Sequence, residues 1–200
     1  TSVVVLNIGG ISNFTYLDGK DNFYGSDCGP GNALMDIYCQ KFLNRPYDKN
    51  GAHAKNGEVH TPSLDKMLDH SFFRRRHPKS TGKEIFNIKF IPKILLKKSS
   101  NDILATLTEL TSVCIAKSLL SLKKKPDRVI VCGGGQKNNF LVSSIEKHIR
   151  MPLTSSNKYS FDPQAIEAMA FGWMARQRVL RNPLLVKKNR GLLGTLTKFK

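Results

Sequence analysis

One acidic side chain, Asp27, lies in a stretch rich in glycine and proline, GSDCGPGN at residues 25–32. Such a stretch restricts the backbone, and a firmly held carboxylate can take a proton from an attacking oxygen, as kinase chemistry requires. Asp is also a frequent helix N-cap, and an apolar stripe with helical spacing begins at Ala33. The local pattern therefore leaves two roles open for Asp27, a general base and a helix cap.

Two further glycine motifs could bring the backbone close to a phosphate. Gly9-Gly10 joins two hydrophobic segments, and this motif alone is explained as well by an ordinary β-hairpin turn. Gly133-Gly134-Gly135 follows the apolar run RVIVC, and Asn138 opens the next helical pattern. Three consecutive glycines cost stability, and a helix N-terminus favours anions, so we favour a ligand-binding loop here over a flexible connection.

A fourth motif, HPKSTGKE at residues 77–84, resembles a phosphate-binding P-loop only superficially, because the required spacing of Gly, Lys and Ser or Thr is absent. A capping box explains it better, with Ser80 or Thr81 as the cap and Glu84 completing the box. We therefore expect a helix to start here, with Lys79 or Ser80 lining a cleft. The histidines show no metal-ligand spacing, so no metal-ligating residue is predicted.

The composition bears on partners and compartment. The net charge is +17, which could indicate a nucleic-acid partner, but aromatic residues do not interleave with the lysine clusters at 97–98, 123–125 and 187–188. We therefore favour charge spread over solvated faces, and no nucleic acid partner. No signal peptide or long uncharged apolar run is evident, so no membrane span is predicted. The cysteine pattern fits a reducing compartment, hence the cytoplasm.

The elements that must position these motifs follow from periodicity. Residues 3–8 and 11–17 predict two strands, residues 23–24 a short third strand, and residues 27–32 a break before a helix at Ala33. The rest is predicted as a surface excursion at 45–62, a short helix from Thr61, a long helix from an Asn101 cap, a buried strand at 128–132, a helix at 138–149, a strand near 152–154, a last helix capped by Asp162, and a basic tail at 181–200 with a late strand at Leu192-Leu193-Gly194. The order β-β-β-α, then β-α-β-α, indicates an α/β fold with a mixed sheet flanked by helices.

In this order, the three glycine-centred motifs resemble the second half of the sugar kinase/heat-shock-protein-70/actin superfamily, a ribonuclease-H-like lobe. Longer stretches are similar to the anhydro-N-acetylmuramic acid kinase family: LNIGGISNFTYL, DCGPGNALMD, YDKNGAHAKNGEV, PKSTGKEIFN, ATLTELT, VCGGGQKNNFL and DPQAIEAMAFGWMARQR. This resemblance covers nearly the whole chain and fades after about Arg181.

The resemblance implies a cytoplasmic kinase that uses ATP and Mg²⁺, forms a homodimer and acts in cell-wall recycling. Water would open the 1,6-anhydro bridge of anhydro-N-acetylmuramic acid, and the freed O6 would take the γ-phosphoryl group. Asp27 matches the catalytic base. The nucleotide-binding positions are Gly9, Gly10, Gly133, Gly134, Gly135 and Asn138, and the candidate contacts to the amino sugar are Asn13, Asn32, Lys79 and Ser80.

Two departures from the family pattern bear on activity. The family usually has Phe-Asp-Thr where this chain has Ser26-Asp27-Cys28, which would loosen the placement of the carboxylate. The Gly-Thr-Ser-x-Asp-Gly phosphate loop of the family's first lobe is also absent. We therefore expect residues 1–200 to be the C-terminal lobe of a two-lobe kinase, with further residues upstream of Thr1. The alternative is a truncated, inactive module of the same superfamily that binds nucleotide or a partner.

Overall fold

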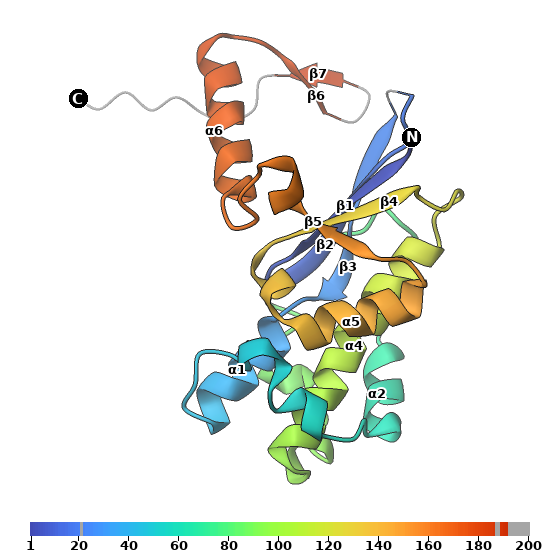
Figure 1. Ribbon diagram of the computed structural model, residues 1–200, viewed down its shortest axis with the longest axis vertical. Coiled ribbons are helices and arrows are strands. Elements are labelled where there is room, and N and C mark those ends of the chain that lie inside the picture. The colour runs from blue at the N-terminus through green and yellow to red at the C-terminus, as the bar shows by residue number, and fades with distance from the viewer. Residues whose placement is uncertain (21, 187–188, 192–200) are drawn as a thin grey trace, which may run out of the picture.

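A five-stranded mixed sheet forms the centre of the fold (Figure 1), in a computed structural model that describes residues 1–20, 22–186 and 189–191. Its order is β3-β2-β1-β4-β5, with β2 antiparallel to both β1 and β3, and β4 and β5 parallel to β1. The strands are β1 (Val3–Ile8), β2 (Ile11–Leu17), β3 (Phe23–Pro30), β4 (Arg128–Cys132) and β5 (Leu153–Ser155). This is the predicted ribonuclease-H-like arrangement.

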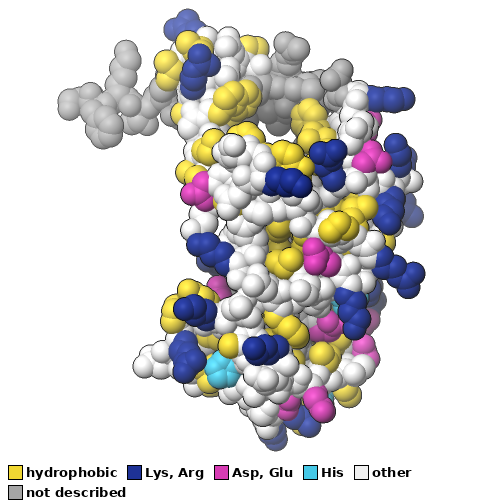
Figure 2. Space-filling view, in the orientation of Figure 1, with side chains coloured by type: hydrophobic (Ala, Val, Ile, Leu, Met, Phe, Trp, Pro, Cys, Tyr) yellow, Lys and Arg dark blue, Asp and Glu magenta, His cyan; other side chains and the backbone are white. Residues whose placement is uncertain are grey.

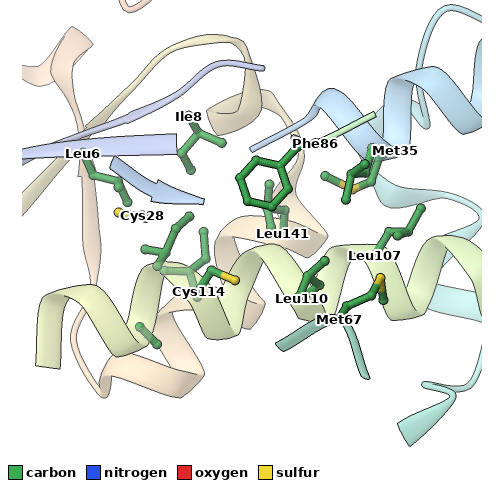
Figure 3. Close-up of a cluster of buried hydrophobic side chains, with 14 of the residues drawn as sticks. Leu6, Ile8, Cys28, Met35, Met67, Phe86, Leu107, Leu110, Cys114 and Leu141 are labelled. Atoms are coloured by element: carbon green, nitrogen blue, oxygen red, sulfur yellow. The ribbon is translucent and has the colours of Figure 1, made fainter. Parts of the chain in front are cut away.

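The central strand β1 shows why these residues form a sheet. Its β-branched residues favour the extended backbone, and alternate side chains point to opposite faces. Val4, Leu6 and Ile8 are fully buried, whereas the residues between them are only partly buried. Leu6 and Ile8 face a core that also contains Phe86, Leu110 and Cys114 (Figure 3). The sheet therefore has one face covered by helices and a second, more polar face.

The helices that cover this core are mainly α4 and α5. The helical elements are α1 (Ala33–Phe42), α2 (Thr61–Leu68), α3 (Ser71–Arg74), α4 (Ser100–Leu120), α5 (Asn139–Ile149) and α6 (Ile166–Val179). By length and hydropathy α4 could cross a membrane, but 78% of its apolar window is buried inside the protein. We therefore assign α4 as the core helix of the fold.

The excursion at residues 45–62 is more ordered than its composition suggests. It contains two short 3₁₀ turns, Lys49–Gly51 and Ala54–Asn56. The buried carboxylate of Asp48 accepts hydrogen bonds from the backbone N–H groups of His53 and Ala54, at 2.9 and 3.0 Å. Asn50 accepts a hydrogen bond from the first residue of α5, Asn139, at 3.0 Å. The excursion is thereby fixed beside the start of α5.

Several predicted boundaries are wrong. Residues 27–30 continue β3, because Asp27 pairs with Asn13 of β2 across a β-bulge instead of breaking the strand. No helix starts at residues 80–84, where the backbone forms turns. Ser99, not Asn101, caps α4 through its side chain, which accepts from Asp102 N at 3.1 Å.

The C-terminal region also differs from expectation. The N-cap position of α6 is Ala165 and not Asp162, and no side chain caps this helix. The face predicted to be apolar is not buried, since Met169 and Trp173 are about half exposed. A two-stranded sheet, β6 (Leu184–Val186) and β7 (Asn189–Gly191), lies in the predicted basic tail. The late strand predicted at residues 192–194 falls outside the described residues.

Candidate active site

The three glycine motifs meet at one edge of the sheet, where β1, β3 and β4 all have their carboxyl ends. The N–H groups of Gly31 and Asn32 donate to the carbonyl oxygens of Gly10 and Gly9, at 2.9 and 2.8 Å. The carbonyl of Gly31 in turn accepts from the side chain of Thr111 in α4, at 2.9 Å. Ligands of open α/β sheets bind at such an edge, so the fold brings the three motifs together where a ligand would lie.

Close packing explains two of the three glycines after β4. Gly133 has a φ of +83°, and a Cβ there would lie 2.3 Å from Asn7 Oδ1 and 2.7 Å from the carbonyl oxygen of Ile8. A Cβ on Gly135 would lie 2.2 Å from Ile8 Cγ2, whereas a Cβ on Gly134 would meet nothing within 4 Å. The loop is therefore packed tightly against the end of β1, and only its middle glycine faces open space.

Asp27 is held through both its backbone and its side chain. The backbone N–H of Asp27 donates to the carbonyl of Lys79 at 2.9 Å, and Oδ2 of its carboxylate accepts from Thr81 N at 2.7 Å. Partial burial raises the pKa of the Asp27 carboxyl above its usual value, and the Thr81 hydrogen bond lowers it in part. The first residue before α1 is Asn32, so Asp27 does not cap that helix. Of the two roles left open by the sequence, the helix cap is wrong.

A row of polar side chains crosses the more polar face of the sheet at this edge. Asp27 of β3 lies opposite Asn13 of β2, Asn13 lies opposite Asn7 of β1, and Asn7 lies beside Cys132 of β4. Paired residues on neighbouring strands share a face, so the row places a carboxylate, two amides and a thiol in line. The sequence analysis did not select Asn7, although it is the polar residue within the apolar run of β1.

A cavity of about 600 Å³ opens beside the glycine loop. It contains the predicted positions Asn32, Gly134, Gly135 and Asn138, with walls from the 45–62 excursion and from α1. Asn138 itself caps α5, because its side chain accepts from Leu141 N at 3.1 Å. The loop and helix N-terminus that were predicted to hold a nucleotide therefore line one hollow.

Two residues of this region, Asp36 and Lys83, were missed by the sequence analysis. Asp36 lines the cavity, and its burial raises the pKa of the carboxyl to about 6, an effect that the positive charge of Lys83 partly offsets. The side chain of Lys83 lies against Gly10, with its Cε 3.2 Å from where a Cβ of that glycine would be. The motif HPKSTGKE at residues 77–84 was the available signal for Lys83.

The predicted sugar contacts do not all lie together. Asn13 is in the polar row and Asn32 lines the 600 Å³ cavity. Lys79 points elsewhere, since its Nζ lies 3.2 Å from the carbonyl of Phe72 and 4.5 Å from the centre of that ring. Ser80 is exposed and lines none of the cavities described here.

The departures at residues 26 and 28 lie on the other face of the strand from the carboxylate. Both Ser26 and Cys28 are buried. Ser26 Oγ lies 2.6 Å from His77 Nδ1 and accepts from Lys79 N at 2.9 Å, while Cys28 is in the core cluster. Ser26 therefore fixes the segment that carries Thr81, the donor to Asp27.

A family profile and individual curated sequences all point to the same protein family. A family profile described as anhydro-N-acetylmuramic acid kinase matches residues 1–196. The chain is 43% identical to the anhydro-N-acetylmuramic acid kinase of Gamma-proteobacterium EBAC31A08, over 98% of this chain and 55% of that protein. It is 40% identical to the one from Hydrogenovibrio crunogenus, over 92% of this chain and 50% of that protein. The chain thus spans about half the length of the curated relatives that it matches.

Solved structures with the same fold are more distant. The activator of the 2-hydroxyisocaproyl-CoA dehydratase from Clostridium difficile, with bound ADPNP, has a TM-score of 0.53 and 16% identity, covering 92% of this chain and 64% of that one. A xylulose kinase from Lactobacillus acidophilus also has a TM-score of 0.53, with 13% identity, covering 90% of this chain and 39% of that one. These likenesses support the fold alone.

Proposed function

The chain belongs to the anhydro-N-acetylmuramic acid kinase family, and on this basis we propose that it forms one lobe, the C-terminal one, of a two-lobe kinase that transfers phosphate from ATP to anhydro-N-acetylmuramic acid. The observation that carries the proposal is the position of Asp27. Its anchored carboxylate lies at the sheet edge where the three glycine motifs meet. The half-length match to the relatives supports a second lobe on the other side of that edge.

The proposed reaction has two bond changes at one sugar. Water attacks the anomeric carbon, the bond between C1 and O6 breaks, and C1 keeps the new hydroxyl group. O6 then attacks the γ-phosphorus and ADP leaves. Asp27 would take the proton of the attacking water, and a base works best when its pKa lies near the working pH. The partial burial that raises the pKa of Asp27 moves the carboxyl in that direction.

The nucleotide would lie along the glycine edge with its base in the 600 Å³ cavity. The turn at Gly9-Gly10 and the loop at residues 133–135 offer backbone close to the phosphates. Tyr47 and Asn50 line the cavity and provide an aromatic face and an amide for the adenosine.

Asp36 is the carboxylate that fits a magnesium ion in this site. It lines the nucleotide cavity, and the carboxylate of Asp48 there is already occupied by two backbone donors. Mg²⁺ prefers oxygen ligands and is typically held by one or two carboxylates together with phosphates. When bound, the ion would neutralise charge on the transferring phosphoryl group.

The proposal also covers the cellular compartment and the binding partners. The four cysteines are free and buried, which fits the reducing cytoplasm. Lys and Arg side chains are scattered over the displayed face of the molecule (Figure 2), so the net charge of +17 does not form a single stripe there. Nucleic acid is accordingly not part of the proposed function, whereas the homodimer implied by the family stays a prediction.

The test is phosphate transfer from Mg-ATP to 1,6-anhydro-N-acetylmuramic acid. We would compare the 200-residue chain with the same chain fused to the remaining half of the Gamma-proteobacterium relative. We expect turnover by the fusion alone, and a loss of about 10²–10⁴-fold in the Asp27→Asn fusion with unchanged ATP affinity. Asp65→Asn, an exposed position on α2, is the matched control. A folded fusion that binds ATP without turnover would contradict the kinase proposal and favour a nucleotide-binding module.

A further inference from the structure

A cavity of about 910 Å³ lies on the helix-covered side of the sheet, apart from the candidate active site. Its walls are the hairpin of β2 and β3, the segment 73–79 and the C-terminal end of α4 with the residues that follow it. Of the glycine motifs only Cys28 reaches it, from the buried face of β3, and none of the polar-row residues lines it. The proposed phosphate transfer therefore leaves this cavity without a role.

The described lining of this cavity is strongly cationic. Its wall carries Lys79 and six further basic side chains, Lys20, Arg75, Arg76, Lys117, Lys123 and Lys124, against a single carboxylate, Asp18. The carboxylate of Asp18 already accepts hydrogen bonds within its own turn, from Lys20 N at 2.7 Å and from Asn22 Nδ2 at 2.7 Å. Cations gathered around a concave surface create a positive potential that attracts anions.

Lys79 shows that this charge reaches into the cavity. It is partly buried, and this burial lowers the pKa of its ammonium group. Its Nζ contacts the carbonyl and the ring of Phe72, and the ion pairs formed by the described residues do not include it. A cation kept partly out of water without an acidic partner is costly, and an anionic ligand would reduce that cost.

The floor of the cavity is apolar. Phe73, Cys28 and Cys114 line it, and the two cysteines are buried in the core. Tyr16 and Tyr24, whose ring centres are 5.8 Å apart, form the wall on the sheet side. A ligand that fits both surfaces has an apolar body and a multiply charged anionic group, which cationic side chains recognise through charge-assisted hydrogen bonds.

We propose that this cavity is a second binding site that takes a small organic phosphate. A cavity with buried side chains in its floor suits a compact molecule better than a nucleic acid, which requires an extended cationic track with aromatic residues along it. The assignment stands on the cavity alone and is independent of the proposed kinase reaction.

The site is linked through the backbone to the candidate base. Lys79 lies in its wall, the carbonyl of Lys79 accepts from Asp27 N, and Thr81 two residues later donates to the Asp27 carboxylate. Ser26, which precedes Asp27, holds the same segment through His77 and Lys79. A ligand that orders residues 77–81 would therefore bear directly on the position of the carboxylate, which makes the cavity suited to regulation.

Titration calorimetry on the 200-residue chain tests the assignment with two dianions, inorganic phosphate and phenyl phosphate. We expect phenyl phosphate to bind at least about threefold more tightly, because its ring would cover the apolar floor. The Lys117→Glu/Lys124→Glu chain should bind it about tenfold more weakly. The Lys66→Glu/Lys147→Glu chain carries the same charge change on exposed faces of α2 and α5 and should bind within about twofold of the unchanged protein.

Three results would overturn the assignment. The first is equal weakening by both double variants, which would mean that net charge alone attracts the anion. The second is phenyl phosphate binding no better than inorganic phosphate. The third is a short DNA duplex that displaces phenyl phosphate and depends on Lys117 and Lys124, which would identify a nucleic-acid surface. A failed kinase assay would leave the calorimetry unaffected, so the two proposals can fail separately.

Discussion

The candidate base Asp27 is oriented by a residue that is distant in the sequence but close in space. Asp27 supplies the carboxylate, while Thr81, which is 54 residues away in the sequence, supplies the hydrogen bond that orients it. The departures at Ser26 and Cys28 raised the expectation of a loosely placed carboxylate, but both side chains point to the buried face. The orientation of Asp27 therefore depends on the segment 77–81, which Ser26 holds in place from the buried face.

Asp36 gives a prediction for the pH dependence of stability. Burial raises the pKa of this carboxyl from 3.8 to about 6, so the folded state holds a proton that the unfolded state has lost between these pH values. The free energy of unfolding should therefore fall as the pH rises through this window. Above about pH 6 the Asp36 carboxylate is ionised in the folded protein, and the cost of burying its charge is the same at every higher pH. Asp36→Asn removes that cost.

We expect Asp36→Asn to raise the melting temperature by a few degrees at pH 7 and to leave it unchanged near pH 3.5. The gain should be about 1 kcal/mol, less than the full shift would give, because the group is partly exposed. Thermal denaturation across this pH range measures it, with Asp65→Asn as the exposed control. A lower melting temperature at pH 7 would show that Lys83 stabilises the carboxylate by more than burial costs.

At the scale of one element, the loop after β4 offers a matched pair of glycines. Gly133→Ala forces a Cβ into a left-handed backbone and against the carbonyl of Ile8, whereas Gly134→Ala places the same methyl group in open space. We expect Gly133→Ala to cost about 2 kcal/mol or more and Gly134→Ala to stay within about 0.5 kcal/mol. Urea denaturation of both proteins decides this, and similar losses would mean that the loop is not packed on β1 as described.

The sequence predicted these elements unevenly, for identifiable reasons. The buried strand at 128–132 and the helix after Asn138 follow from local patterns, and both are confirmed. The extent of β3 was wrong because the pairing of Asp27 with Asn13 depends on a bulge at Cys28, which glycine and proline content conceals. The helix predicted at Ser80 was wrong because Thr81 N is used by Asp27 and not by a local cap.

At the scale of the whole molecule, the order of helices and strands along the chain indicated an α/β fold with a mixed sheet, and the resemblance to the sugar kinase superfamily supplied the ribonuclease-H-like lobe, which matches the observed sheet. For the candidate site, the sequence pointed to residues only where one local motif carries them, as with Asp27 and the glycine loop. Asn7, Asp36 and Lys83 were missed because their places depend on contacts between distant segments. The basic cavity was missed for the same reason, because its cations come from several separate parts of the chain.

The half-length match leads to a last prediction, about nucleotide affinity. A ligand held between two lobes loses about half of its contacts when one lobe is absent, and each 1.4 kcal/mol lost weakens binding about tenfold. We therefore expect calorimetry to show that the 200-residue chain binds Mg-ATP at least about tenfold more weakly than the fusion with the second half of the relative.

That residual binding should depend on the 600 Å³ cavity. Lys49→Glu/Lys137→Glu changes two exposed side chains in its wall and should weaken the binding of Mg-ATP by the chain alone about tenfold, because the added carboxylates repel the phosphates. Lys66→Glu/Lys147→Glu should not, since neither lysine lines the cavity. Equal Mg-ATP affinity of the chain and the fusion would mean that this lobe holds the whole nucleotide site, and the second lobe would then be needed only for the sugar.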